Sequence, residues 1–427
     1  MRHLTASAIL LIVMSLLFSA CGPAPSASLA QSSLPREMNP NVSQDNLSTL
    51  VDGNNAFALD LYQALRTQTG NLVYSPYSIS LALAMTYAGA RGQTESQMAG
   101  TLHFTLPQDQ LHPAFNQLDL NLEQEGKSDA KDQQPLQLNV ANGVWAQQDH
   151  PFQQAFLDLI AQNYGAGIHL ADFVKNAESI RQEINGWVSD RTNSKIQNLI
   201  PQGALDALTR MVLVNAIYFK ADWQEPFDPN STHDAPFNLL NGSQVQVKMM
   251  SNTLHGVPYT SGDGYQAIEL AYQGGNAAMD IIVPDEGKFN DFETTINSKK
   301  VDEILNQLQP SDVNLSLPKF TYSSDFGLSD TLKSLGMTDA FDANKADFSG
   351  MDGARDLFIG AVIHKAFVAV DEKGTEAAAA TAVIMQAMSA PMPPPVQLTV
   401  DRPFIFIIRD LSSKQILFIG RVENPVQ

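Results

Sequence analysis

The region from Asp371 to Pro395 reads DEKGTEAAAATAVIMQAMSAPMPPP. Between Thr375 and Ala390 it contains neither Pro nor Gly, and Glu376 is its only ionisable side chain. Gly374 beside three charged residues gives the backbone a place to change direction, whereas the prolines hold the chain extended and cannot donate to a β-ladder. The region is therefore expected to be flexible at its start and stiff at its end.

Two secondary structures compete within this region. Alanine has the highest helix propensity and a poor strand propensity, so composition alone favours a helix or a linker over Thr375–Met388. As a strand, the region would place Glu376 on a face that can stay in water. The opposite face would carry only small or β-branched side chains, which could slide against a packed layer without clashing: Thr375, Ala377, Ala379, Thr381 and Val383.

The stretch from Glu372 to Thr381 resembles the hinge of a serpin reactive-centre loop, with the pattern E-x-G-T-E-A-A-A-A-T. This resemblance implies the serpin fold, which is an α+β fold of mixed helices and three β-sheets with an exposed loop, here about residues 372–395. The hinge residues it implies are Glu372, Gly374, Thr375, Glu376, Ala377, Ala378, Ala379 and Ala380.

Three further blocks resemble serpins at the spacing that the family shows, so that the resemblance covers Asn55–Pro425. The first is S-P-x-S at Ser75–Ser78, which locally reads as the capped start of a buried helix. The second, Val214–Phe227, matches V-N-A-I-Y-F-K-x-x-W-x-x-P-F, and the third is the apolar pair of strands in Val400–Pro425.

The resemblance implies a group of residues that governs how readily the main sheet opens: Ser75, Ser78, Asn215, Trp223 and His364. Local reasoning gives each of them a simpler role. Asn215 interrupts a strand that is buried on both faces, and an unpaired buried amide would cost about 1 to 3 kcal/mol. His364 reads as a hydrogen-bonded core histidine, and Trp223 reads as core or as a lid. In the family the histidine, the asparagine and the serines converge, and their role is gating without proton transfer.

The resemblance also implies a mechanism, in which the exposed loop is bait for a protease. After cleavage its amino-terminal part would enter the main sheet as a new central strand, and serpin loop insertion is itself an established example of strand addition. Counting from the hinge glutamate places the cleaved bond at Met388–Ser389, with Met385–Gln386 and Ala387–Met388 as alternatives. Met or Ala before the bond suits elastase-like or chymotrypsin-like pockets better than a trypsin pocket.

The amino terminus resembles a bacterial lipoprotein signal peptide, with an apolar run from Ala6 to Phe18 and small residues before Cys21. The run is shorter than the ~20 residues of a membrane-spanning helix. We therefore expect a signal peptide at 1–20, lipid attachment at Cys21, a flexible tether at 21–50 and the folded domain at 51–427. The protein would be exported and anchored to a bacterial membrane. An ordinary secretory peptide or an uncleaved anchor is the alternative.

Composition disfavours several partners. The 427 residues carry a formal net charge of -19, which disfavours nucleic acid and anionic membrane surfaces, so membrane contact is expected only through the lipid. Cys21 is the only cysteine, so no intrachain disulfide can form. A content of 44% hydrophobic residues can build a large core, and we expect a monomer.

The sequence offers no positive argument for an enzyme. It holds no nucleophile elbow, P-loop or metal-spaced Cys/His cluster, so we expect no catalytic residue, no metal and no cofactor. Three functions remain open: a suicide inhibitor of serine proteases that forms a covalent complex, a non-inhibitory binding protein, and a hydrolase of unrelated fold. Cysteine proteases are alternative targets within the first function.

Alternating helical and strand periods predict one mixed domain. Helices are expected at Asn55–Thr67, Phe152–Tyr164, Ala177–Thr192 and Asp325–Leu335, and strands at Leu136–Trp145, Met211–Phe219, Gln244–Met250, Tyr265–Tyr272, Ala278–Val283 and Val313–Tyr322.

Overall fold

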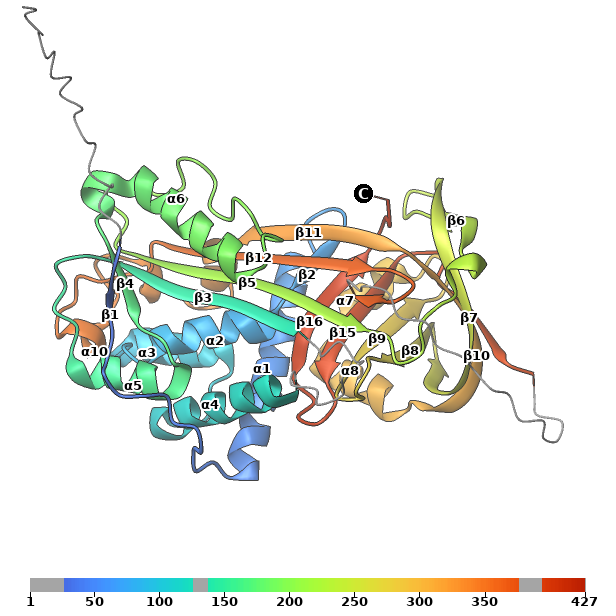
Figure 1. Cartoon of the computed structure of the whole chain (residues 1–427), viewed down its shortest axis with the longest axis horizontal. Coiled ribbons are helices and arrows are strands. Elements are labelled where there is room, and N and C mark those ends of the chain that lie inside the picture. The colour runs from blue at the N-terminus through green and yellow to red at the C-terminus, as the bar shows by residue number, and fades with distance from the viewer. Residues whose placement is uncertain (1–26, 126–136, 376–393, 427) are drawn as a thin grey trace, which may run out of the picture.

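A computed structural model describes residues 27–125, 137–375 and 394–426 of the chain. A seven-stranded sheet runs along the long axis of the molecule, with α2 against one face and α6 against the other (Figure 1). Its strands, in spatial order, are β1 (Ser28–Ala30), β4 (Ile168–Ala171), β3 (Gln137–Gln147), β5 (Met211–Asp222), β13 (Gly374–Thr375), β12 (Ala361–Val370) and β11 (Phe320–Gly327).

A second, nine-stranded sheet forms the other end of the molecule (Figure 1). Its strands, in spatial order, are β14 (Val396–Thr399), β10 (Gln309–Pro318), β7 (Gln244–Gly262), β8 (Tyr265–Ala271), β9 (Ala277–Pro284), β15 (Phe404–Asp410), β16 (Ile416–Val422) and β2 (Leu72–Tyr74), while β6 (His233–Asn238) pairs with β7 alone. The long strand β7 joins two parts of this sheet, because it pairs with β6 and β10 first and with β8 only from Tyr259 onward. The three predicted sheets are thus one separate sheet and two parts that share β7.

The helices pack around these sheets: α1 (Gln44–Leu65), α2 (Pro76–Tyr87), α3 (Gly92–Leu102), α4 (Gln108–Glu125), α5 (Gln154–Tyr164), α6 (Phe173–Arg191), α7 (Phe289–Thr295), α8 (Ser298–Asn306), α9 (Ser329–Ser334) and α10 (Ser349–Asp352), with short 3-10 turns η1 (Pro229–Ser231) and η2 (Asp339–Phe341). All twelve residues of α2 are buried, as its almost wholly apolar sequence predicts. Pro76 opens the helix, and Ser75 caps it by accepting a hydrogen bond from the Ser78 backbone N–H.

Strand β5 lies in the middle of the seven-stranded sheet. Its run from Met211 to Phe219 is buried on both faces, which confirms the prediction from its unbroken apolar sequence. It pairs antiparallel with β3 on one side and parallel with β12 on the other. This placement makes β5 one wall of any gap that opens in the sheet.

The predicted tether is wrong for residues 28–50, which belong to the folded body. β1 pairs antiparallel with β4 at the edge of the sheet, and Arg36 forms ion pairs with Asp119 and Glu123 of α4 at 2.6 and 2.8 Å. Helix α1 begins at Gln44, eleven residues before the expected start at Asn55. Its first turns bury Leu47, Leu50 and Val51, whose helical spacing is hard to recognise among the surrounding Ser, Asn and Asp residues.

A second correction concerns residues 313–335. The expected single strand Val313–Tyr322 is split between the two sheets, since β10 ends at Pro318 and β11 begins at Phe320. Residues 325–327, expected in a helix, complete β11, and α9 starts only at Ser329. The chain passes from one sheet to the other within this segment, but its apolar residues keep alternating throughout. Pro318 is the only local signal of the crossing point.

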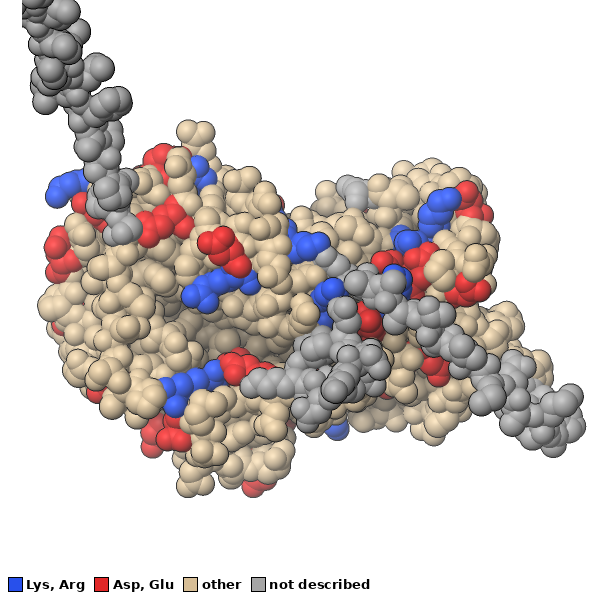
Figure 2. All heavy atoms as spheres, in the orientation of Figure 1, with Lys and Arg blue, Asp and Glu red and all other residues tan. Residues whose placement is uncertain are grey.

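Within the ranges that the structure describes, no helix is both long and apolar enough to cross a membrane. On the face seen in Figure 2, basic and acidic side chains lie interspersed.

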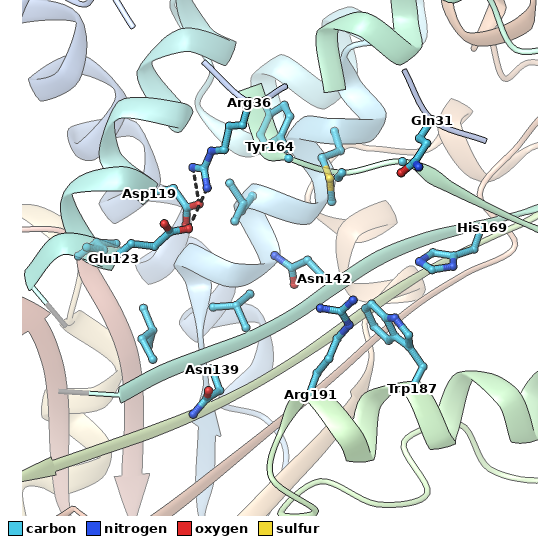
Figure 3. A pocket seen from close by; sticks show the side chains of 18 of the residues that line it. Gln31, Arg36, Asp119, Glu123, Asn139, Asn142, Tyr164, His169, Trp187 and Arg191 are labelled. Atoms are coloured by element: carbon cyan, nitrogen blue, oxygen red, sulfur yellow. Dashed lines mark hydrogen bonds and ion pairs between the residues drawn. The ribbon is translucent and has the colours of Figure 1, made fainter. Parts of the chain in front are cut away.

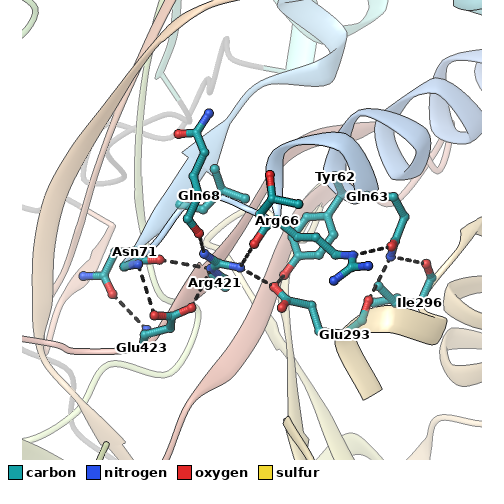
Figure 4. Close-up of polar contacts among 12 residues, drawn as sticks. Tyr62, Gln63, Arg66, Gln68, Asn71, Glu293, Ile296, Arg421 and Glu423 are labelled. Atoms are coloured by element: carbon teal, nitrogen blue, oxygen red, sulfur yellow. Dashed lines mark hydrogen bonds and ion pairs between the residues drawn. The ribbon is translucent and has the colours of Figure 1, made fainter. Parts of the chain in front are cut away.

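Arg421 of β16 organises a buried polar cluster that joins α1, α7 and the loop before β2 (Figure 4). Its side chain is 2% exposed, and its Nη1 donates to Glu293 Oε1 at 2.6 Å and to the Arg66 carbonyl at 2.9 Å. The Tyr62 hydroxyl donates to the same Glu293 oxygen at 2.8 Å. Arg421 also forms an ion pair with Glu423 at 3.0 Å, whereas the buried Glu293 carboxylate has Arg421 as its ion-pair partner in the described part of the chain.

Replacing Arg421 with Met should lower the free energy of unfolding by about 3 to 5 kcal/mol, because it leaves the Glu293 carboxylate buried without a counter-charge. The double variant Arg421→Met/Glu293→Leu should recover a large part of that loss. Denaturant unfolding of both variants measures the difference. A loss below about 1 kcal/mol in the single variant would contradict the assignment of this pair as a buried ion pair.

Candidate functional site

The candidate site is the line along which β5 and β12 meet, which we call the seam. Residues Val212–Tyr218 of β5 pair in parallel with residues Ala361–Phe367 of β12. At one end of the seam the chain leaves β12 at Val370, turns, and comes back as β13. Thr375 then lies antiparallel to both neighbours, opposite Val370 on β12 and Ala221 on β5. The first residues of the predicted loop have thus already entered the sheet.

Trp223 holds the turn that precedes β13. Its backbone N–H donates to the Lys373 carbonyl at 2.7 Å, and its indole Nε1–H donates to the Asp371 carbonyl at 3.0 Å. The indole stacks on Tyr272 with ring centroids 4.7 Å apart and planes at 7°. The Tyr272 hydroxyl in turn shares a hydrogen bond of 2.7 Å with Thr375 Oγ1. Trp223 and Tyr272 therefore fix the position of β13 between β5 and β12.

Glu372 anchors the same turn by its side chain. Its carboxylate accepts hydrogen bonds from Lys319 Nζ at 2.7 Å and from Thr232 Oγ1 at 2.8 Å, and its backbone carbonyl accepts from Phe227 N–H at 2.7 Å. Partial burial by itself raises the pKa of this carboxyl, but the bonds from Lys319 and Thr232 outweigh burial, so that its pKa lies below the usual range. The predicted hinge residue therefore acts here as an ionised anchor.

A buried polar cluster closes the middle of the seam. His364 of β12 lies directly opposite Asn215 of β5, and its Nδ1 donates to the Asn215 side-chain oxygen. Its Nε2 accepts a bond of 3.1 Å from the Ser75 backbone N–H. The Asn215 amide then donates to Ser78 Oγ and to the side-chain oxygen of Asn142 on β3. Three strands and the start of α2 thus meet at one hydrogen-bonded set.

These contacts define the protonation state of His364. A ring with a donor at Nδ1 and an acceptor at Nε2 is neutral. Complete burial lowers the pKa of the imidazole from 6.5 to about 3, which agrees with this assignment. The residue therefore reads as a hydrogen-bond partner across the seam, and the cluster contains no nucleophile beside a base.

The structure brings four of the five predicted sheet-opening residues together, namely Ser75, Ser78, Asn215 and His364. Trp223 lies apart from them, at the hinge end of the seam. Asn142 was not predicted, because only the register that sets it opposite Asn215 brings it into the cluster. The remaining site residues lie outside the described ranges: Cys21, Glu376, Ala377, Ala378, Ala379, Ala380, Met388 and Ser389.

A cavity of about 710 Å³ lies away from the hinge turn, between the amino-terminal segment, α4, β3 and α6 (Figure 3). Figure 2 shows the surface hollowed in this region. Its lining includes Arg36, His169 and Asn142, and burial together with Arg191 lowers the pKa of His169 to about 4. Only Asn142 connects this cavity with the polar cluster of the seam.

A sheet whose central seam is closed by two parallel strands, with a third strand already started between them, is a sheet built to accept an inserted strand. The comparisons agree with this description. Residues 52–425 match the family model described as Serpin (serine protease inhibitor). The chain belongs to the serpin family, which confirms the predicted fold and supports the prediction of an inhibitor over that of an enzyme.

The chain is similar to named relatives over most of its length. It is 39% identical over 389 residues to leukocyte elastase inhibitor A of Rattus norvegicus, covering 89% of this chain and 100% of the relative. It is 38% identical over 393 residues to leukocyte elastase inhibitor of Homo sapiens, with the same coverage of 89% and 100%. The native crystal structure of the thermophilic serpin tengpin superposes with a TM-score of 0.81 at 29% identity, covering 94% of this chain and 100% of that one.

The buried His364 should make the stability of the folded protein depend on pH in a specific way. Because its pKa is about 3 in the folded protein and about 6.5 when unfolded, its contribution to stability is complete above pH 6.5 and is lost as the pH falls toward 3. The variant His364→Gln should be less stable at pH 7. As the pH falls from 6.5 to 4, the variant should lose stability less steeply than the parent protein. The difference between the two slopes should be up to about 1.4 kcal/mol per pH unit.

Denaturant unfolding at several pH values measures this slope. His112→Gln is the positive control, because burial lowers the pKa of His112 to about 3 as well, at a place outside the seam. The assignment of a neutral His364 would be wrong if its Gln variant kept the slope of the parent protein.

Proposed function

We propose that this protein is an irreversible suicide-substrate inhibitor of serine proteases with elastase-like or chymotrypsin-like pockets. The observation that carries the proposal is the position of β13 between β5 and β12. A loop that has already started along the seam has a path by which the rest can follow once its far end is released. Cleavage of the loop by a protease would supply that release.

The register of β13 defines where the loop would go. Thr375 now lies opposite Val370 on β12 and Ala221 on β5. If the antiparallel register continues, each further loop residue lies opposite the preceding residue of both strands, and residue 384 would lie opposite Ala361 and Val212. Those two residues are themselves paired at the far end of the seam. The segment 376–384 would therefore fill the whole overlap of β5 and β12.

The same register would bring Thr381 between His364 and Asn215, which now face each other directly. Insertion would thus require the His364–Asn215 hydrogen bond to break. A short side chain with a hydroxyl can take up bonds that these two groups release. The polar cluster would hold the seam closed before cleavage and would accept the new strand afterwards.

The side chains of the loop fit this path. Thr375 is fully buried and points to Tyr272, so alternate residues of a continuing strand would share its inward face. The residues concerned are small or β-branched: Ala377, Ala379, Thr381 and Val383. Glu376 would begin the opposite face, where α6 lies.

Energetics favour the inserted state. About a dozen inserted residues, at a net 0.5 to 1.5 kcal/mol per backbone hydrogen bond, give a gain on the order of ten kcal/mol. The entropy of ordering the loop offsets part of it. Because both new ladders are antiparallel, they replace one parallel ladder with two of the more stable kind.

The trapping step needs only the chemistry of the protease. Its serine Oγ attacks the carbonyl of Met388, an ester forms, and the Met388–Ser389 peptide bond breaks with a proton passing to the leaving amine of Ser389. Insertion would then carry the attached protease along the sheet and pull its catalytic serine away from the oxyanion hole, which stops hydrolysis. The bonds Met385–Gln386 and Ala387–Met388 remain alternative positions for the ester.

The elastase-type specificity is supported by Met388 and by the similarity to leukocyte elastase inhibitors. A non-inhibitory binding protein of the same fold would be cleaved without forming a complex. Cysteine proteases would form a thioester in place of the ester and are a second target class.

We also propose that the protein is exported and carries a lipid on Cys21, as a bacterial lipoprotein-type member of the family. The support is the sequence of residues 1–21, with its short apolar run before the only cysteine. Since residues 27–50 pack on the folded body, only residues 22–26 would separate the lipid from it.

Incubation with pancreatic elastase, neutrophil elastase or chymotrypsin should give a covalent complex that survives denaturing electrophoresis. The protein should be the chain from Gly22 onward, because a start at Asn55 would cut α1 and remove β1. Intact mass should show the sum of the two proteins and a released fragment that begins at Ser389. Trypsin should form no such complex. Complete cleavage with all protease activity retained would overturn the proposal.

Two neighbouring substitutions separate insertion from protease binding. Ala377→Arg would put a charge on the face that Thr375 shares, where an unpaired buried charge costs about 3 kcal/mol or more, so the yield of complex should fall about a hundredfold. Glu376→Arg would put the same charge on the opposite face, where the register sets it between the partly exposed Lys220 and Ala369, and should keep most of the yield. Cleavage of both variants shows that the protease still recognises the loop. Equal yields of complex would contradict the register.

A further inference from the structure

Three possible metal ligands meet at the far end of the seam, opposite the hinge turn. His150 lies in the loop between β3 and α5, Asp352 is the last residue of α10, and Asp356 lies in the loop that leads into β12. We propose that these residues form a site for a divalent transition-metal ion, of which Zn²⁺ is the test case, and that the bound ion holds the seam closed. The action on the seam rests on the proposed function, whereas the site itself does not.

The distances fit such an ion. His150 Nδ1 lies 3.0 Å from Asp352 Oδ2 and 3.7 Å from Asp356 Oδ1, and the three ligand atoms lie within 4.8 Å of one another. An ion with four tetrahedral bonds of about 2.0 to 2.1 Å separates neighbouring ligand atoms by roughly 3.3 Å. The observed separations lie on both sides of this value, so small side-chain movements bring all three atoms to bonding distance.

The surroundings orient two of the ligands and leave the third at the surface. The Asp352 side chain is fully buried, and its Oδ1 accepts the Ala354 backbone N–H at 2.8 Å, which leaves Oδ2 turned toward His150. The His150 side chain is 12% exposed and that of Asp356 is 65% exposed. An ion can thus enter from the side of Asp356 and meet two ligands that are already in place.

The donor set distinguishes between classes of ion. One imidazole nitrogen with two carboxylates suits Zn²⁺ and similar transition ions, whereas Ca²⁺ and Mg²⁺ prefer oxygen ligands alone. Binding requires a free lone pair on Nδ1, so an imidazole that carries its proton there passes it to water or to Nε2. Three protein ligands leave one position for water.

Sequence spacing could not indicate this site, because some two hundred residues separate His150 from the two aspartates. Within the described part of the chain, this is the only group of three such residues whose ligand atoms converge. His255 and Asp312 also approach each other, at 3.3 Å, but they have no third ligand. That pair therefore serves as the control.

The three ligands come from opposite sides of the seam. His150 follows β3, which is bonded to β5. Asp352 lies on the same side as His150, because Gln153 N–H donates to the Met351 carbonyl of α10 at 2.7 Å. Asp356 comes from the other side, since it precedes β12 by five residues. An inserted strand widens a sheet by about 4.8 Å. Metal bonds of about 2.1 Å cannot stretch by that amount, so the ion and full insertion exclude each other.

Mass action gives the size of the effect. A ligand that binds only the closed form at one hundred times its Kd favours that form by about a hundredfold. Zn²⁺ should therefore slow the last part of insertion, and more of the cleaved inhibitor should release active protease.

Calorimetric titration of the chain from Gly22 onward with ZnCl₂ at neutral pH tests the site. We expect one ion per chain, and an affinity at least about tenfold weaker in His150→Gln and in Asp356→Asn. Asp356 is exposed, so its Asn variant leaves the fold intact. His255→Gln should bind like the parent protein. No binding, or unchanged affinity in both site variants, would overturn the site.

The yield of covalent complex with neutrophil elastase, measured with ZnCl₂ and with EDTA, tests the action on the seam. Zn²⁺ should lower the yield for the parent protein and for His255→Gln but not for Asp356→Asn, which also controls for any effect of Zn²⁺ on the protease. Stoichiometric binding with an unchanged yield would overturn the action on the seam. An absence of complexes in EDTA would contradict the proposed function, and the titration would still decide the site.

Discussion

Direct pairing between β5 and β12 is the contact on which the rest of the molecule depends. It is a parallel ladder between β5, which is buried on both faces, and β12, in which alternate residues are only partly buried, and it closes the centre of the large sheet. β13 enters the same line antiparallel to both. Since antiparallel ladders are the more stable kind, the folded protein retains a pairing that a third strand can replace with a gain in stability. The closed sheet is thus the form of the protein before the loop is cleaved.

Different groups of residues lie at the hinge end, in the middle and at the far end of the seam. At the hinge end, Trp223 and Glu372 fix the turn that precedes β13. In the middle, the neutral His364 and Asn215 bind each other across the two strands. At the far end, His150 and Asp352 meet Asp356, which comes from the side of β12. A strand that enters from the hinge end meets these groups in that order, so each can affect a different stage of insertion.

Sequence reasoning indicated properties set by near neighbours better than contacts between distant segments. The small-residue face of the hinge and the capped start of α2 follow from local spacing, and a buried Asn or His must find a partner wherever it lies. Asn142 and the amino-terminal segment were missed. The role of Asn142 depends on a register across three strands, and residues 28–50 look like a linker because their apolar residues are few.

The sequence by itself determined the elements and the residue types: a buried strand from Met211, a helix that begins at Ser75, and a loop whose alternate residues are small. These properties depend on neighbours within a few positions, because propensity, capping and periodicity act over one or two turns or strand repeats. Only the tertiary structure decided that His364 faces Asn215, that Thr375 lies between β5 and β12, and that His150 meets two aspartates. Contacts between residues hundreds of positions apart are set by sheet register and packing, which no local stretch of the chain encodes.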